Sequence, residues 1–138
     1  MANYISTYRS SYFRVKDVSK FIEWCDGLHL RYIEEVDKSG NILSGFTQSD
    51  FGDDGGLPSF RYSDEEGDWE EVDMVSELAD HLLDEEVAII MESGAEKLRY
   101  VMGLAWAVNS KGEIVQVSLH DIYEMANQLG KNYTACEY

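Results

Sequence analysis

The chain has 138 residues and a formal net charge of −16, a length that suits a single domain with its own hydrophobic core. Hydrophobic and aromatic contents of 44% and 12% exclude an intrinsically disordered chain. The negative charge argues against direct binding of nucleic acid or of anionic membrane surfaces, because both would be repelled.

The sequence shows no sign of a membrane segment or of a secreted protein. No apolar run approaches the roughly 18 residues that a membrane-spanning helix needs, and the start MANYISTYRSSYF lacks the charged-then-apolar layout of a signal peptide. Cys25 and Cys136 are far apart and indicate buried free thiols, not a disulfide framework. We therefore expect a cytoplasmic protein.

The first 48 residues predict a strand, a helix and a hairpin. Residues 4–15 alternate, with one set of side chains on each face: Ile5, Thr7, Phe13 and Val15 against Tyr4, Tyr8 and Tyr12. Asp17 is a suitable N-cap for a helix over residues 18–27, whose apolar positions have helical spacing. Residues 29–36 and 41–48 flank the turn sequence DKSG, which is typical of a hairpin.

The middle of the chain predicts a long loop followed by a helix. Residues 50–72 show no period and contain several glycines and the single proline, which indicate a loop. Its aromatic residues, including Phe60 and Tyr62, indicate that parts of this loop dock on the body. The sequence DMVSELADHLLDEE, residues 73–86, predicts an amphipathic helix. Its buried stripe comprises Met74, Val75, Leu78, Ala79, Leu82 and Leu83.

The last third predicts three strands and a helix. VAIIME (87–92) is a strongly apolar, central strand, and the turns SGAE and NSKG separate it from strands over residues 98–109 and 113–119. Residues 120–130 form the last helix, with Ile122, Met125, Ala126 and Leu129 inward, and Ser118 with Asp121 resembles a capping box. The order β-α-β-β-α-β-β-β-α predicts a single α+β domain over residues 1–138. Five to six strands form a mainly antiparallel sheet with three helices.

No motif indicates catalysis, a metal or a cofactor. A calcium loop aligned from Asp50 would place Gly52 and Arg61 where oxygen ligands are required. His29, His81 and His120 are isolated in sequence. His81 lies among acids, which would hold its proton more firmly. We predict no catalytic residue, no metal ligand and no cofactor.

Negative charge is concentrated in one quarter of the chain. Residues 50–86 hold fifteen acids and one base, Arg61, while the other 101 residues carry a net charge of −2. In the predicted helix, the acids at positions 73, 77, 80 and 84 share one face without the lysines that normally support such a row. Asp84, Glu85 and Glu86 would also face the negative end of the helix dipole.

This distribution predicts a binding surface for a basic protein. A row of carboxylates has the electrostatic outline of a phosphate backbone, and Trp69 would supply an apolar anchor within it. The predicted partner-binding residues are Asp64, Glu65, Glu66, Asp68, Trp69, Glu70, Glu71, Asp73, Glu77, Asp80 and Asp84.

The acidic block 64–73, the helix 73–86 and the small size resemble the DNA-mimic inhibitors of phages and plasmids, of the anti-restriction and anti-CRISPR kind. The resemblance implies a non-enzymatic inhibitor that acts in the host cytoplasm and covers the basic channel of a restriction or CRISPR effector.

Three alternatives stay open at this point. One is an immunity protein that neutralises a cationic toxin or nuclease, since it needs the same acidic face. Another is a small enzyme whose histidines meet carboxylates in a cleft. The third is a domain whose acidic loop only aids solubility. The sequence also allows a homodimer, through the apolar stretch LRYVMGLAWAV at a sheet edge.

Overall fold

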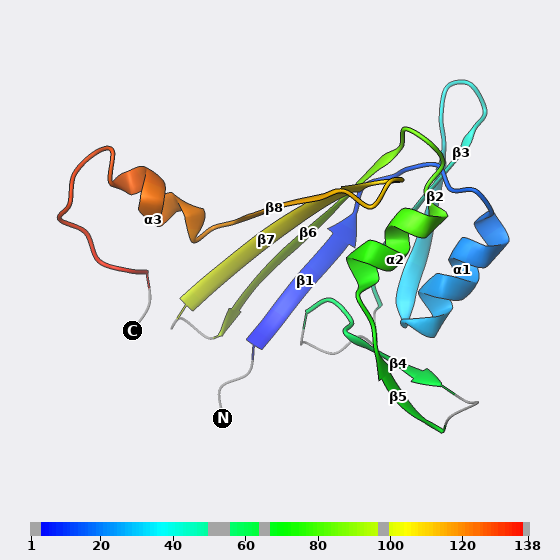
Figure 1. Cartoon of the computed structure of the whole chain (residues 1–138), viewed down its shortest axis with the longest axis horizontal. Helices are drawn as coiled ribbons and strands as arrows, with labels where there is room; N and C mark the ends of the chain where they lie inside the picture. The colour runs from blue at the N-terminus through cyan, green and yellow to red at the C-terminus, as the bar shows by residue number, and fades with distance from the viewer. Residues whose placement is uncertain (1–3, 50–55, 64–66, 97–99, 137–138) are drawn as a thin grey trace.

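The computed structural model describes residues 4–49, 56–63, 67–96 and 100–136. Within these residues, three helices and eight strands follow one another (Figure 1). In chain order they are β1 (Tyr4–Ser10), α1 (Val18–Gly27), β2 (Leu30–Val36), β3 (Ile42–Gln48), β4 (Phe60–Ser63), β5 (Asp68–Glu71), α2 (Met74–His81), β6 (Val87–Glu96), β7 (Tyr100–Asn109), β8 (Ile114–Ser118) and α3 (Asp121–Ala126).

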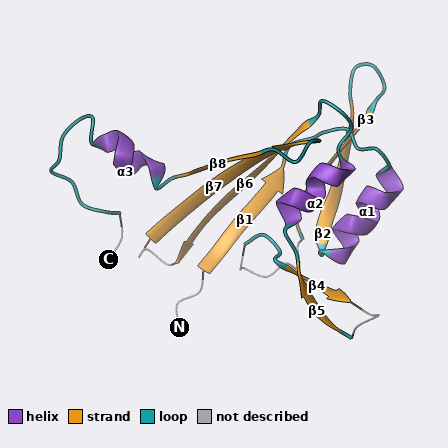
Figure 2. Ribbon diagram, in the orientation of Figure 1, coloured by secondary structure: helices purple, strands orange, loops and turns teal. Residues whose placement is uncertain are grey.

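Six of the strands form one antiparallel sheet in the order β2-β3-β1-β6-β7-β8. β4 and β5 pair separately as a small hairpin (Figure 2). The predicted α+β class, the three helices, the mainly antiparallel sheet and the element order are confirmed. The β4–β5 hairpin lies inside the region predicted to be a loop.

The helix cap and the hairpin turn predicted in the first third are both present. The Asp17 side chain caps α1, accepting a hydrogen bond of 3.1 Å from the backbone N–H of Lys20. In the β2–β3 turn, Asp37 accepts hydrogen bonds from the backbone N–H groups of Asn41 and Ser39 at 2.9 and 2.8 Å. These bonds lower the pKa of the Asp37 carboxyl, and the bond from the Asn41 N–H has the largest effect.

α1 and α2 lie side by side over one face of the sheet (Figure 1), and the core lies between them and the strands. Phe21 is fully buried, and its ring packs edge-on against Phe13 and stacks on Trp24. Cys25 is a buried free thiol as predicted, and burial, followed by the nearby Asp26, raises its pKa to about 12. Cys136 is exposed, so the prediction that both thiols are buried is wrong for it.

The first strand ends earlier than its alternation predicts. β1 stops at Ser10, whose hydroxyl donates to the Ser11 carbonyl at 2.7 Å and accepts from the Phe46 N–H at 2.9 Å. After this break, Phe13 pairs with Ser44 in an isolated bridge. As a result Tyr8 and Phe13, which were predicted to face opposite sides, are buried in the same core.

The second helix is also shorter than predicted, ending at His81 and not near residue 86. Leu82 has extended backbone angles (φ −77°, ψ 139°), is fully buried and forms an isolated bridge with Val15. The burial of Leu82 beside Val15 favours an extended backbone more than the spacing of apolar residues favours a longer helix. Asp84, Glu85 and Glu86 therefore lie outside the helix, and the predicted dipole penalty does not apply to them.

The last third departs most from the prediction. β6 continues through the predicted turn SGAE to Glu96, and β7 lies between β6 and β8, not at an edge. α3 lies beyond the end of β8, away from α1 and α2 (Figure 1). Its predicted inward residues Ile122 and Met125 are 55% and 58% exposed, and Leu129 is 94% exposed. No described element covers them, because β8 carries α3 past the end of the sheet.

The predicted place of β6 is confirmed, and the predicted start of the last helix is not. β6 is central as predicted, since it pairs with β1 on one side and β7 on the other. Asp121 accepts a hydrogen bond of 2.8 Å from the Ser118 N–H, but the predicted capping box is wrong, because Ser118 ends β8 and the N-cap of α3 is His120, which makes no side-chain cap hydrogen bond. Within the described residues, no helix has the length and apolar character that crossing a membrane requires.

Candidate functional site

The acidic segment forms the β4–β5 hairpin and α2, which follow each other at one end of the molecule (Figure 2). The structure places the predicted residues Asp68, Trp69, Glu70 and Glu71 on β5, all exposed. Asp73 caps α2, Glu77 and Asp80 lie on α2, and Asp84 lies in the turn before β6. The predicted residues Asp64, Glu65 and Glu66 lie outside the described residues.

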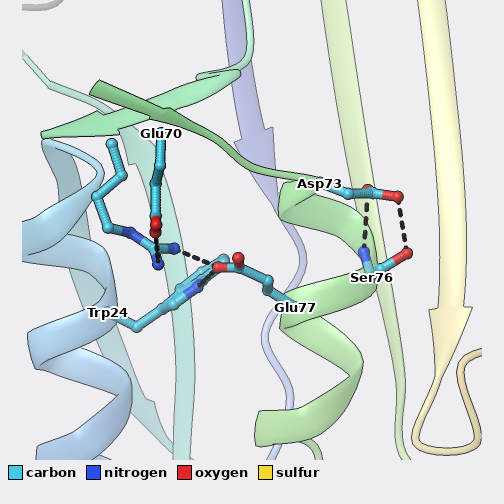
Figure 3. Close-up of polar contacts among 6 residues, drawn as sticks. Trp24, Glu70, Asp73, Ser76 and Glu77 are labelled. Atoms are coloured by element: carbon cyan, nitrogen blue, oxygen red, sulfur yellow. Dashed lines mark hydrogen bonds and ion pairs between the residues drawn. The ribbon is translucent and has the colours of Figure 1, made fainter. Parts of the chain in front are cut away.

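Arg61, the one base of the acidic segment, joins the hairpin to the helices. Its guanidinium pairs with Glu70 across the hairpin, Nη1 to Oε1 at 3.3 Å, and with Oε1 of Glu77 on α2. The same Glu77 oxygen accepts a hydrogen bond of 2.9 Å from the indole N–H of Trp24 on α1 (Figure 3). These contacts fix the orientation of the hairpin relative to both helices.

Three of the predicted binding carboxylates therefore have roles within the fold: Asp73, Glu77 and Glu70, the last of which pairs with Arg61. Asp73 accepts hydrogen bonds from the Ser76 N–H and hydroxyl at 3.3 and 2.9 Å, as an N-cap does (Figure 3). Glu77 is only partly exposed and neutralises Arg61. The predicted row of four free carboxylates on one helix face is thus reduced to Asp80 on α2, with Asp84 beyond its end.

The two faces of the hairpin differ in character. Opposite residues of an antiparallel pair share a face, and successive residues alternate between faces. The Arg61–Glu70 pair points toward α1 and α2, so the Phe60–Glu71 pair and Trp69 lie on the outward face. The side chains of Phe60 and Trp69 are 56% and 59% exposed. Among the described residues, the outward face therefore combines two large aromatic rings with the Glu71 carboxylate, and aromatic rings are enriched in interfaces.

The three histidines have separate surroundings. The ring of His81 packs against Phe21 and Trp24, and that of His120 against Tyr123. His29 is exposed just after α1, with a φ of 58°. Burial lowers the pKa of His81 and outweighs the opposing effect of Asp80 and Glu77. The expectation that neighbouring acids hold its proton more firmly is wrong, because the ring is packed between two helices.

The sequence prediction missed Arg61 and Trp24, which position the site without belonging to its exposed surface. The isolation of Arg61 among fifteen acids in residues 50–86 was the available signal. Across the described ranges, no three His, Cys, Asp or Glu side chains are grouped closely enough to hold a metal ion. Comparisons with models of protein families, with curated proteins and with solved structures gave no match.

Proposed function

We propose that this protein is a non-enzymatic inhibitor that binds a basic nucleic-acid-handling protein, such as a host restriction or CRISPR effector, through the β4–β5 hairpin and the adjoining acidic surface. The observation that carries the proposal is the outward face of the hairpin, where Phe60 and Trp69 are exposed beside Glu71 within a strongly acidic segment. Exposed aromatic rings supply affinity in an interface, while the surrounding charge sets orientation and speeds association.

The arrangement of the charges supports a partly nucleic-acid-like surface. The segment 50–86 holds a net charge of −14, and its only base is turned inward onto Glu70 and Glu77. Outside this inward cluster, the exposed Asp68, Glu71, Asp80 and Asp84 contribute a field of one sign. A basic groove that normally holds phosphates would be attracted to such a field.

The test separates the exposed carboxylates from those that hold the fold. The neutralised variant carries Asp68→Asn, Glu71→Gln, Asp80→Asn and Asp84→Asn, and keeps Asp73, Glu70 and Glu77. The matched control removes four exposed charges elsewhere by Glu23→Gln, Asp26→Asn, Glu35→Gln and Glu124→Gln. Both variants change the net charge equally, so a difference between them reports position and not total charge.

The measurement is capture of host-lysate proteins on the immobilised chain, followed by inhibition of the captured protein's nucleic-acid binding or cleavage. We expect capture at about 0.05 M salt to weaken at about 0.5 M, because ions screen exposed charges. The neutralised variant should lose capture and inhibition, and the control should keep both. If the neutralised variant binds and inhibits like the wild type, the proposed surface is wrong. Capture of a cationic toxin would instead indicate an immunity protein.

A single substitution tests the aromatic part of the surface. Trp69→Ala should weaken binding about 30-fold or more, as loss of an interface hot spot does, whereas the matched charge control should bind with wild-type affinity. Unchanged affinity would show that the partner does not contact the outward face of the hairpin.

A further inference from the structure

One face of the large sheet is not covered by any described element. Alternate residues of β6 point away from α1 and α2, and their partners on β7 and β8 lie on the same side. The large apolar side chains of this open face are 40% to 70% exposed: Val87, Ile89, Met91, Val101, Val115, Val117 and Leu119. An apolar area of this extent on a soluble chain marks an interaction surface.

The open face contains a groove. Its volume is about 780 Å³, and Met91, Ala105 and Val117 are among the residues that line it. The small residues Gly103 and Ala105 form its floor, and Leu119 folds over Gly103, where an added Cβ would lie 2.7 Å from the Leu119 Cγ. The groove is therefore shaped by the strand residues and has room for apolar side chains.

The C-terminal arm, residues 119–136, carries an uncovered apolar stripe. Ile122, Met125 and Leu129 recur at steps of three and four and are at least 55% exposed. Contacts within the arm hold its shape: the Tyr133 hydroxyl donates to the Tyr123 carbonyl at 2.9 Å, and the two rings stack. The Cys136 N–H donates to the Tyr123 hydroxyl at 2.8 Å. The arm is thus folded locally, with its apolar side chains in solvent.

The exposed area of the chain is larger than that of a compact monomer. The chain exposes 9563 Å², whereas a compact monomer of 15.7 kDa exposes about 7,300 Å². The difference, about 2,300 Å², is more than twice the roughly 800 Å² that each partner of a standard interface buries. The excess is therefore large enough for an interface of at least standard size on this chain.

The charge of this region permits a second copy to approach. Residues 87–138 carry six acids and four bases, a net charge of −2, while the strongly acidic segment lies elsewhere in the chain. Two copies related by a two-fold axis present the same patch to each other. Each copy has both an uncovered groove and an uncovered stripe, so the stripe of each copy can cover the groove of the other.

We propose that this protein forms a two-fold homodimer in which the arm 119–136 of each copy covers the open sheet face of the other. Ile122, Met125 and Leu129 of one copy then occupy the groove beside Ala105 and Val117 of its partner. This proposal does not depend on the proposed inhibitor function, because it uses no residue of the acidic segment.

Sedimentation equilibrium of the full chain tests the proposal. The wild type should have twice the 15.7 kDa mass of one chain at micromolar concentration. The arm variant Ile122→Asn, Met125→Asn, Leu129→Asn should raise the dimer dissociation constant about 100-fold or more. Its three side chains make no core contact, so the fold should persist by circular dichroism. The control Val36→Asn, Ile42→Asn changes apolar side chains of similar exposure on β2 and β3 and should remain dimeric.

A mixing experiment tests which surfaces meet. A groove variant, Ala105→Gln with Val117→Asn, should also be monomeric alone. Mixed with the arm variant, it should form a heterodimer, because one intact arm and one intact groove then remain. A wild type that stays monomeric would overturn the dimer. Dimerisation of the arm variant with wild-type affinity, or a mixture of two folded variants that stays monomeric, would overturn the exchange of arms.

Discussion

The two faces of β6 have similar composition and different surroundings. Ala88 and Ile90 point toward α1 and α2 and are fully buried, while Ile89 and Met91 point the other way and are 40% and 61% exposed. A strand that is apolar on both faces is typical of a sheet covered on both sides. The described elements of one chain cover only the first face, and the proposed dimer would cover the second.

The largest expected effect on stability comes from substituting one of two adjacent isoleucines of β6. Ile90→Ala should lower the free energy of unfolding by about 2–5 kcal/mol, because it removes a fully buried side chain and leaves a cavity. Ile89→Ala should cost less than about 1 kcal/mol in the monomeric arm variant, where the open face stays in water. Urea unfolding of both substitutions in that background measures the difference, and equal losses would contradict the assignment of the two faces.

Two glycines allow a comparison between a backbone atom and a side chain as the neighbour of an added Cβ. A Cβ at Gly45 would lie 2.7 Å from the Ser11 carbonyl oxygen, and one at Gly103 would lie equally close to Leu119 Cγ. Gly45→Ala should cost about 1–3 kcal/mol, because a backbone atom must shift. Gly103→Ala should cost less, since the Leu119 side chain can move. Thermal unfolding of the two variants tests this order, and a greater loss from Gly103→Ala would refute it.

The acids of α2 allow a similar comparison between a partnered and an exposed carboxylate. Glu77→Gln should lower the free energy of unfolding by about 1–2 kcal/mol, because Arg61 and Trp24 lose a charged acceptor. Asp80→Asn should change it by less than about 0.5 kcal/mol, as at other exposed positions. Urea unfolding distinguishes the two, and the interpretation fails if Asp80→Asn is the more damaging change.

The smallest expected effect is a pH dependence from His81. Burial lowers its pKa in the folded state, so below the ordinary value of about 6.5 the unfolded chain binds a proton that the folded chain resists. The neutral His81 ring therefore costs no stability above that pH, and the free energy of unfolding falls as the pH drops below it. Between about pH 7.5 and about pH 5.5, His81→Gln should therefore reduce the loss of stability measured by urea unfolding. The exposed His29→Gln serves as the control, and equal pH profiles for wild type and His81→Gln would contradict the effect.

The elements of this protein whose cause lies within a few residues were predictable from the sequence alone. Asp17 and the spacing of Phe21 and Cys25 determine α1, and the turn at Asp37 determines the β2–β3 hairpin. The concentration of acids also indicated the candidate surface, because charge is a property of composition. Local caps and periodicity act over one or two turns of chain, which is why the predictions of α1 and of the β2–β3 hairpin are confirmed.

Contacts between segments that are distant in the chain determine the features that the sequence did not predict. α2 ends at His81 because Leu82 is buried beside Val15, 67 positions away in the chain numbering. Glu77 is an internal partner and not a free binding charge because Arg61 and Trp24 reach it from two other elements. The stripe on α3 stays exposed because β8 carries it past the sheet. Periodicity shows that a face is apolar, but only the path of the chain determines which surface, its own or another molecule's, can cover it.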